Sequence, residues 1–475
     1  MFVLPMHHRF LIAMIMCIYN RFVIALFLAL FELFSTSAFS APISLKDALI
    51  RALKTSEEVA ISREDLAKSK LFPYRALSVI MPSVDYTLDY IHSKEVLGTS
   101  RNGLEGRDGY IDDDFNHSSK GGFILTQRLI DVSFPVLLAQ SKHVVKASSA
   151  NLFYVSQEYL FQVVSAYYKA LQARRILRIN EEFLRQTKEH LDVARVRLEV
   201  GEVIRTDVLR AEVDVATATR NLIKSKNDLN LAMENLARYL HMPQGKIDLK
   251  IPVTLIKPKL PLEEMLKLTY RARADLKNYE EAIYMARNDK QLVFTRFFPS
   301  LDMQASWDRY GDTPYPQGRD NWSVFGVLTM PILDGGLRFI DLRDTTSSLI
   351  QATQRYLALK RDIDYSIREA YLNIITFEKT IDASMVEEEA SRSNLELINE
   401  QYRVGLADSI DVVDAQAVYL NAQINLTNNI FDHEIAVYNL KRVVGLNLLD
   451  PSWQLTFKNE EYYRKWLDYL LSVTS

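Results

Sequence analysis

Cysteine is almost absent from this chain of 475 residues, which contains only Cys17. The residues before it, Ala13-Met14-Ile15-Met16, lack the small side chains that precede the acylated cysteine of a lipoprotein signal. Downstream of Cys17 the chain has no cysteine at all, which excludes disulfides, thiolate metal ligands and a cysteine nucleophile there.

An excess of one charge is also missing, since 57 basic and 60 acidic residues are interspersed and give a formal net charge of −3. Such a chain has no long-range field that would attract a nucleic acid, so we expect no nucleic-acid partner. The eight histidines show no metal-ligand spacing. With no constellation of acid, base and nucleophile, the sequence predicts neither a metal site, nor a cofactor, nor an enzyme.

Apolar runs of 18 residues are absent after the N-terminal segment, so a membrane could be entered there only as a β-barrel. Arg21 precedes an apolar run over residues 22–34, and the small residues Ala38 and Ser40 stand at the −3 and −1 positions of a cut before Ala41. This order predicts a signal peptide at 1–40. The alternative is a retained anchor, because a second apolar stretch at 11–19 lengthens the segment.

The sequence contains an internal repeat. At an offset of 204, Val200-Gly201 aligns with Val404-Gly405 without a gap, and at an offset of 217, Pro82-Ser83 aligns with Pro299-Ser300. The change of offset locates an insertion between about Tyr90 and Gly121, which is rich in Gly, Asp, Asn and Ser and predicts a long loop. We expect two copies of one domain, 41–245 and 262–447, with a linker at 246–261 and a tail at 448–475.

Each copy is predicted to begin with a helix and to continue with two strands. Val84, Tyr86, Leu88 and Tyr90 alternate with polar residues, as do Leu301, Met303, Ala305 and Trp307, and return strands are expected near 122–130 and 321–332. A half-buried soluble sheet would alternate in the same way. Strands of about 10 residues with aromatic residues near their ends favour a membrane sheet. The aromatic residues expected at the lipid head groups are Tyr86, Tyr90, Trp307, Tyr310 and Trp322.

Long helices are predicted at 135–199 and 338–403, which contain neither Pro nor Gly after Pro135 at the start of the first. Roughly 65 residues correspond to about 100 Å of helix. Shorter helices are expected at 203–241 and 409–444, after turns at Gly201 and Gly405. Apolar residues at spacings of 3 and 4 predict a coiled-coil seam: Ile176, Ile179, Phe183, Leu191, Ala194 and Leu198. The charged runs Arg174-Arg175 and Glu387-Glu388-Glu389 are typical of solvated helix faces.

The predicted fold is mainly α with a β-barrel. Four strands per chain leave two open edges, which hydrocarbon cannot satisfy. Two chains would give 8 strands, whose interior is filled by side chains, whereas three would give 12. We therefore expect a trimeric 12-stranded membrane barrel, continued by a tunnel of twelve helical rods.

The duplicated unit, its opening Leu45-x-x-Ala48-Leu49 and the turn Tyr402-Arg403-Val404-Gly405 resemble the TolC-type outer-membrane factor family over about 43–447. The resemblance implies a homotrimer in the outer membrane that projects into the periplasm and serves as the exit duct of an efflux or type I secretion system. It also implies docking of the helical tips onto a periplasmic membrane-fusion adaptor and an inner-membrane pump of ABC, RND or MFS type.

The resemblance places Asp411 and Asp414 at the periplasmic entrance, where a trimer would form two carboxylate rings that favour cations. An aspartate near a helix N-terminus can also simply stabilise the helix dipole. For Asp207 the two interpretations are equally open. Ala407 stands where the best-known members have a basic residue that ties the closed entrance, so the closing links must differ here. Tyr402, Arg403 and Arg205 are available as substitutes, and the sequence does not choose among them.

The turns contain small apolar tips, Val200, Gly201, Val404, Gly405 and Leu406, which we expect to dock the adaptor. Backbone geometry alone would explain the two glycines but not the flanking Val and Leu. The rival to the whole interpretation is a coiled-coil protein without a pore, either a periplasmic adaptor or a trimeric surface protein. An adaptor has one hairpin and an adhesin has no duplication, so the internal repeat favours the channel.

Overall fold

The computed structural model describes residues 42–94, 115–243, 245, 247–251, 261–311, 316 and 318–449. The predicted signal peptide, the centre of the long first-copy loop, most of the linker and nearly all of the tail lie outside these residues.

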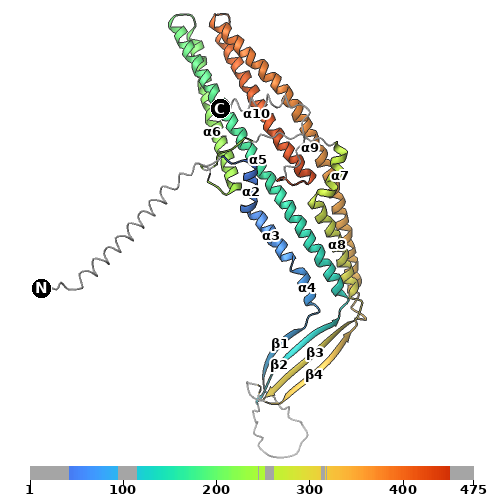
Figure 1. The fold of residues 1–475 in the computed structure, drawn as a ribbon. Coiled ribbons are helices and arrows are strands. Elements are labelled where there is room, and N and C mark those ends of the chain that lie inside the picture. Colours follow the sequence, from blue (N-terminus) through green and yellow to red (C-terminus); the bar gives the residue numbers. More distant parts are fainter. Residues whose placement is uncertain are drawn as a thin grey trace, which may run out of the picture.

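Two long helical hairpins extend from a four-stranded sheet (Figure 1). The first consists of α5 (Ser133–Glu199) and α6 (Arg205–Leu240), and the second of α9 (Leu337–Arg403) and α10 (Ser409–Val444). All four bounds of the second hairpin lie 204 residues after those of the first, so the repeat in the sequence corresponds to a repeat in the structure. With 67 residues each, α5 and α9 are rods of about 100 Å.

The predicted opening helix of each copy is divided. The first copy has α2 (Leu45–Thr55), α3 (Glu57–Ser69) and α4 (Phe72–Ser78), and the second has α7 (Leu262–Ala272) and α8 (Ala274–Thr295). Ser56 causes one of the breaks, because its extended backbone ends α2 while its hydroxyl accepts a hydrogen bond from the Val59 amide at 3.3 Å and starts α3.

The core lies around the middle of the two long helices, where the short helices α2 and α7 pack on them. Leu49 of α2 joins a cluster with Leu160 and Tyr167 of α5, and Met265 of α7 joins a second with Ile363 of α9. The Tyr167 hydroxyl also donates a hydrogen bond to the Ile43 carbonyl at 2.9 Å. Ile247 and Leu249, which were assigned to the linker, belong to the first cluster.

The sheet is an antiparallel meander of β1 (Ser83–Lys94), β2 (Phe115–Ile130), β3 (Ser300–Gly311) and β4 (Asp320–Thr329). β2 of the first copy pairs with β3 of the second, so one sheet joins the two copies. No described helix is both long and apolar enough to cross a membrane.

Three expectations about the strands were wrong in detail. The loop is shorter than predicted, since β1 continues to Lys94 and β2 begins at Phe115, where pairing with β1 overrides the low strand propensity of its Asn, Ser and Gly residues. β4 ends at Thr329, two residues before Pro331, which has no amide to donate to a ladder. Tyr310 lies three residues after Trp307 and therefore on the opposite face, where the Lys120 ammonium is 5.8 Å from its ring centre.

Tyr86, Phe123, Trp307 and Trp322 form one aromatic row across all four strands, because each is the register partner of the next. The ring centres of Phe123 and Trp307 are 6.2 Å apart, and Trp322 at the edge is 75% exposed. Leu125, Ala305 and Val324 extend the same face toward the helices. The sheet therefore has one apolar face with an aromatic band and an opposite face that is mostly polar but also carries Ile124, Phe325 and Val327.

Candidate functional site

The free ends of the two hairpins lie side by side, far from the sheet (Figure 1). Each turn contains a glycine with a left-handed backbone, Gly201 at φ 78° and Gly405 at φ 76°. The amide of Glu202 bonds to the Arg197 carbonyl at 2.9 Å, and that of Leu406 to the Gln401 carbonyl at 2.8 Å, which closes the last turn of each long helix. Both glycines are needed for these turns, as the sequence predicts.

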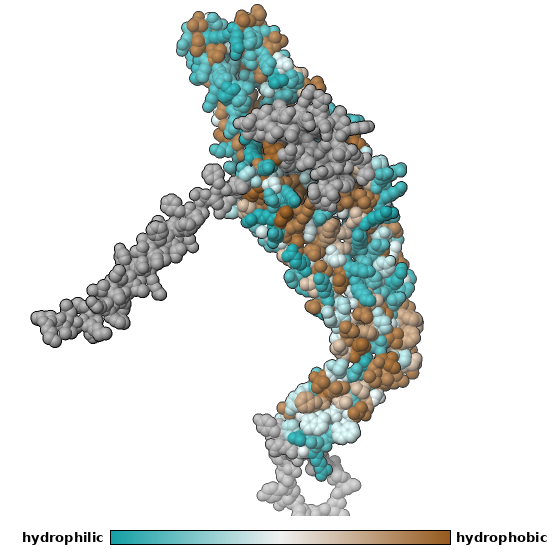
Figure 2. All heavy atoms as spheres, viewed as in Figure 1, coloured by the Kyte–Doolittle hydropathy of each residue, from teal (hydrophilic) through white to brown (hydrophobic). Residues whose placement is uncertain are grey.

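The apolar residues at the tips point into solvent. Val200, Val404 and Leu406 are 66%, 68% and 80% exposed, and Figure 2 shows hydrophobic patches at both tips within a mostly hydrophilic surface. Exposed side chains of this type on a tight turn suit a surface that a partner covers.

Asp411 and Asp207 each stabilise the start of a helix. The Asp411 carboxylate accepts a hydrogen bond from the Asp408 amide at 2.9 Å, and the Asp207 carboxylate accepts one from the Ile204 amide at 3.4 Å. The Asp207 carboxylate is also 4.0 Å from the Arg210 guanidinium. The helix-start interpretation therefore accounts for both residues.

Asp414 lies one turn further along α10 and borders a groove of about 410 Å³ between α6 and α10. The apolar side chains of Leu209, Val213, Ile410 and Val413 line the groove together with the polar ones of Thr206, Arg210 and Ser409. On its α6 side lies Asp214, and burial, followed by the charge of Asp414, raises the pKa of the Asp214 carboxyl. Asp214 could not be recognised from the repeat, because the repeat aligns Asp414 with Arg210 and does not point to Asp214.

Tyr402 lies in the contact between the hairpins. It is 5% exposed, and the Arg197 guanidinium of α5 lies over its ring at 4.3 Å from the centre. The Nη2 atom of Arg197 donates a hydrogen bond to the Arg403 carbonyl oxygen at 3.0 Å, and the Nε atom of Arg197 is 3.8 Å from the Glu202 carboxylate. Arg197 thus joins the end of α5 to the end of α9.

Of the residues considered as substitutes for the missing basic residue, Tyr402 contacts the first hairpin through its ring, whereas Arg403 contributes only its backbone carbonyl. The Arg403 side chain points away and pairs with the exposed Glu400 at 3.2 Å. Arg197 was missed, as was His190, whose Nε2 is 2.9 Å from the Ser409 hydroxyl of α10. Their spacing of seven residues is the signal that places both on one face of α5.

Further polar contacts join α5 to the second hairpin along its length. The Tyr168 hydroxyl donates a hydrogen bond to the Glu434 carboxylate at 3.3 Å, and the Gln172 amide donates one to the Asn428 side chain at 3.0 Å. The interpretation of the charged runs as solvated faces was wrong for Arg175 and Glu388, which are both 7% exposed. Burial raises the pKa of Glu388, and the charges of Arg392 and Arg175 oppose that rise.

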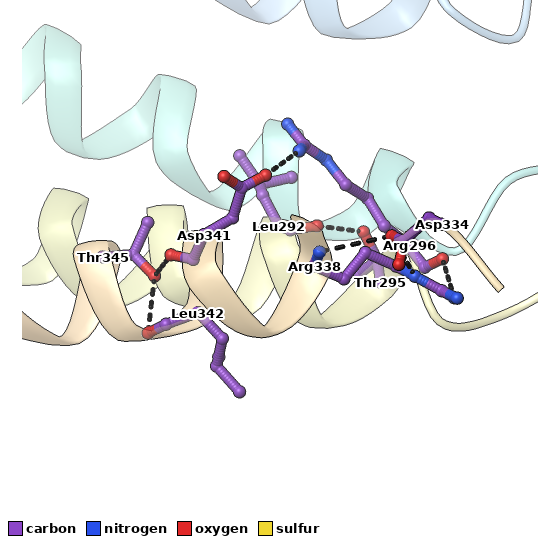
Figure 3. Close-up of polar contacts among 8 residues, drawn as sticks. All are labelled: Leu292, Thr295, Arg296, Asp334, Arg338, Asp341, Leu342 and Thr345. Carbon is purple, nitrogen blue, oxygen red and sulfur yellow. Dashed lines mark hydrogen bonds and ion pairs between the residues drawn. The ribbon is translucent and has the colours of Figure 1, made fainter. Parts of the chain in front are cut away.

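At the other end of α9, Arg338 fixes the junction between sheet and helix (Figure 3). Its guanidinium donates to the Asp334 carboxylate at 2.7 Å and to the Pro331 carbonyl at 3.0 Å. Arg296, which follows the last residue of α8, donates to the Asp341 carboxylate at 2.9 Å. Gly335 and Gly336 between strand and helix have φ values of 69° and 87°, so they ease this junction as predicted.

Comparison with known proteins agrees with this architecture. The chain is 26% identical to the outer membrane efflux protein BepC of Brucella suis over 361 residues, which cover 74% of this chain and 78% of BepC. It is 23% identical to TolC of Escherichia coli over 397 residues, with 78% and 76% coverage. It is 24% identical to the alkaline protease secretion protein AprF of Pseudomonas aeruginosa over 313 residues, with 61% and 62% coverage.

Solved structures have the same fold. The outer membrane channel CmeC of Campylobacter jejuni superposes with a TM-score of 0.74 at 16% identity, covering 89% of this chain and 88% of that one. VceC of Vibrio cholerae gives 0.72 at 15% identity, with 85% and 96% coverage. The family model described as outer membrane efflux protein matches residues 78–240 and 266–446, so both copies of the repeat, and with them the greater part of this chain, belong to the outer membrane efflux protein family.

Proposed function

We propose that this chain is the protomer of a homotrimeric outer-membrane exit duct, which carries exported molecules passively and does no chemistry of its own. Three copies would close a 12-stranded membrane barrel and align the hairpins as a periplasmic tunnel. The observation that carries the proposal is the combination, in one chain, of two long hairpins with an open sheet that has an aromatic band.

Trimer formation is supported by the strand edges and apolar surfaces that a single chain leaves uncovered. In the part of the chain that the structure describes, β1 and β4 each pair on one side only, so both edges are available to a neighbouring copy. Exposed apolar residues lie along α9 and along α6: Ile350, Tyr365, Leu372, Val386 and Leu397 on α9, and Val213, Ile223 and Leu231 on α6. Two different surfaces on one chain suit a head-to-tail interface that closes into a ring.

The membrane would cover the apolar face of the sheet. The row from Tyr86 to Trp322 would lie at the head groups, where amphipathic rings are favoured, and the polar face would line the lumen. The domain limits proposed for the mature protein follow the sequence analysis: a signal peptide at 1–40, repeats at 41–245 and 262–447, a linker at 246–261 and a tail at 448–475.

The hairpin ends would form the gated entrance. Asp411 and Asp414, with Asp207 and Asp214 nearby, would place carboxylates around the axis, while Arg197 and Tyr402 hold the second hairpin against the first. The exposed tips at Val200, Gly201, Val404, Gly405 and Leu406 would receive a periplasmic membrane-fusion adaptor, and through it an inner-membrane pump of ABC, RND or MFS type. Relatives whose names include efflux and protease secretion support both kinds of system.

Single-channel conductance in a planar bilayer tests this function. Asp411→Asn with Asp414→Asn removes both charges, while the amide oxygen introduced at position 411 can still accept the hydrogen bond from the Asp408 amide. We expect the native protein to conduct with cation selectivity and the double variant to lose much of that selectivity and of its block by divalent ions. Glu400→Gln is the matched control, because Glu400 is a tip carboxylate that pairs with Arg403 outside the groove. No conductance from a folded trimer would favour the coiled-coil protein without a pore.

A further inference from the structure

His190 lies at the distal end of the polar contacts between the two hairpins. Its Nε2 is 2.9 Å from the Ser409 hydroxyl at the start of α10, and its ring centre is 5.2 Å from that of Tyr402 at the end of α9. Only 7% of His190 is exposed. One side chain of α5 thus contacts both helices of the second hairpin.

The surroundings of His190 disfavour a positive charge. The charged group that acts on it is Arg197, two turns further along α5, whose guanidinium lies over the ring of the same Tyr402. α9 contributes the neutral Tyr402 phenol and α10 the neutral Ser409 hydroxyl. Toward α6, the neighbouring positions Leu191 and Ala194 pack on Val208 and Ala211 in an apolar cluster.

We propose that His190 is an acid-sensitive latch, in which protonation of the buried imidazole releases the second hairpin from the first near the tips. The latch consists of His190, Arg197, Tyr402 and Ser409. The effect of the latch on transport depends on the proposed gate at the hairpin ends. The separation of the hairpins in acid does not depend on that gate.

The direction of the pH effect follows from the change in surroundings. Burial, and then the charge of Arg197, lower the pKa of His190 from its ordinary value of about 6.5. When the hairpins separate, water reaches the imidazole and its pKa returns toward that value. The closed arrangement therefore binds fewer protons than the separated one, so acid favours separation. The effect begins as the pH falls below about 6.5 and is complete below the lowered pKa.

Distance measurement between the hairpin ends tests the latch directly. Glu199→Cys and Leu406→Cys, in a chain with Cys17→Ser, would carry two spin labels, and pulsed electron paramagnetic resonance would measure their separation at about pH 7.5 and about pH 5. Because acid favours the separated arrangement, we expect the longer-distance population to be several-fold larger at about pH 5 than at about pH 7.5.

Non-titrating variants isolate the imidazole. His190→Gln keeps a polar group beside Ser409, and His190→Phe keeps a ring against Tyr402, so at least one of them should retain the closed arrangement. Both should lose the acid response, whereas His143→Gln, which changes a histidine that pairs with Glu281 of α8, should keep it. Equal distances at both pH values in the native chain, or an acid response that persists in both His190 variants, would overturn the latch.

Conductance measured on the same samples separates the latch from the gate. Acid-induced separation with an unchanged conductance would support the latch and contradict a gate at the hairpin ends. A conductance that rises in acid in the His190 variants while the label distance stays constant would assign the response to the entrance carboxylates and exclude His190 as its sensor.

Discussion

The guanidinium carbon of Arg197 lies 4.3 Å from the centre of the Tyr402 ring, and this contact joins the end of α5 to the end of α9. The pair is largely buried, since Tyr402 is only 5% exposed and the Arg197 side chain 18%. A cation over an aromatic face contributes more when water is excluded, up to about 2 kcal/mol. The two hairpins of the chain are therefore held together close to the proposed entrance.

Replacing Arg197 by alanine should loosen the entrance. The change removes both the contact with Tyr402 and the hydrogen bond to the Arg403 carbonyl. A loss of about 1.4 kcal/mol would raise the ratio of open to closed channels about tenfold, measured as open probability in a planar bilayer. Arg195→Ala is the control, because Arg195 forms an exposed pair with Glu212 inside the first hairpin. An equal effect of the two variants would contradict a specific role for Arg197.

The Tyr402 hydroxyl gives a second prediction. Among the described residues this buried oxygen has no hydrogen-bond partner. Tyr402→Phe should therefore leave the closed state intact, or stabilise it by up to about 1–3 kcal/mol, because an unpaired buried polar group is removed. Tyr402→Ala should open the channel, because the ring over which Arg197 lies is lost. An opening effect of Tyr402→Phe would instead indicate that the hydroxyl bonds to a neighbouring copy.

Patterns along the helices predicted most of the fold. The absence of Pro and Gly over the long stretches and the glycines at 201 and 405 locate the hairpins, and the repeat confirms them, because both copies must satisfy the same backbone geometry. The residues that join the hairpins were harder to predict. Arg175 and Glu388 are buried only because they come from different helices that meet in the folded chain. Charged residues on a single helix give no sign of such a partner.

The strands show the same limit on prediction, because contacts between different segments cannot be recognised from one segment alone. Alternation predicts which residues share a face within one strand, but the row from Tyr86 to Trp322 depends on the register between four strands. Phe123, which continues this row, could be recognised only once β2 was paired. Tyr310 was assigned to the wrong face, although its odd spacing from Trp307 was already visible in the sequence.

The junction in Figure 3 predicts a contrast between two arginines. Arg338 is 8% exposed, and its guanidinium donates hydrogen bonds to the Asp334 carboxylate and to the carbonyls of Pro331 and Arg296. Arg338→Met should therefore destabilise the protein by at least about 2 kcal/mol. The Arg296 side chain is 60% exposed, and losing its pair with Asp341 should cost less than about 1 kcal/mol. The melting temperature in detergent, followed by circular dichroism, distinguishes them. Similar shifts for both variants would show that Arg338 does not hold the junction.

Gly122 should be the least replaceable glycine of the sheet. A Cβ atom there would lie 2.5 Å from Asp308 Oδ1 and still closer to the Trp307 carbonyl oxygen, and backbone of the paired β3 strand cannot yield without breaking the ladder. Gly122→Ala should therefore separate β2 from β3 and so disconnect the two copies of the repeat. Gly326→Ala in β4 is the control, because the nearest atom to its Cβ would be 3.8 Å away. We expect the amount of folded protein in the outer membrane fraction to fall strongly for Gly122→Ala and to stay near the native amount for Gly326→Ala. Normal yield of the Gly122 variant would mean that the pairing of β2 with β3 tolerates a shift, and that the helices rather than the sheet hold the two copies together.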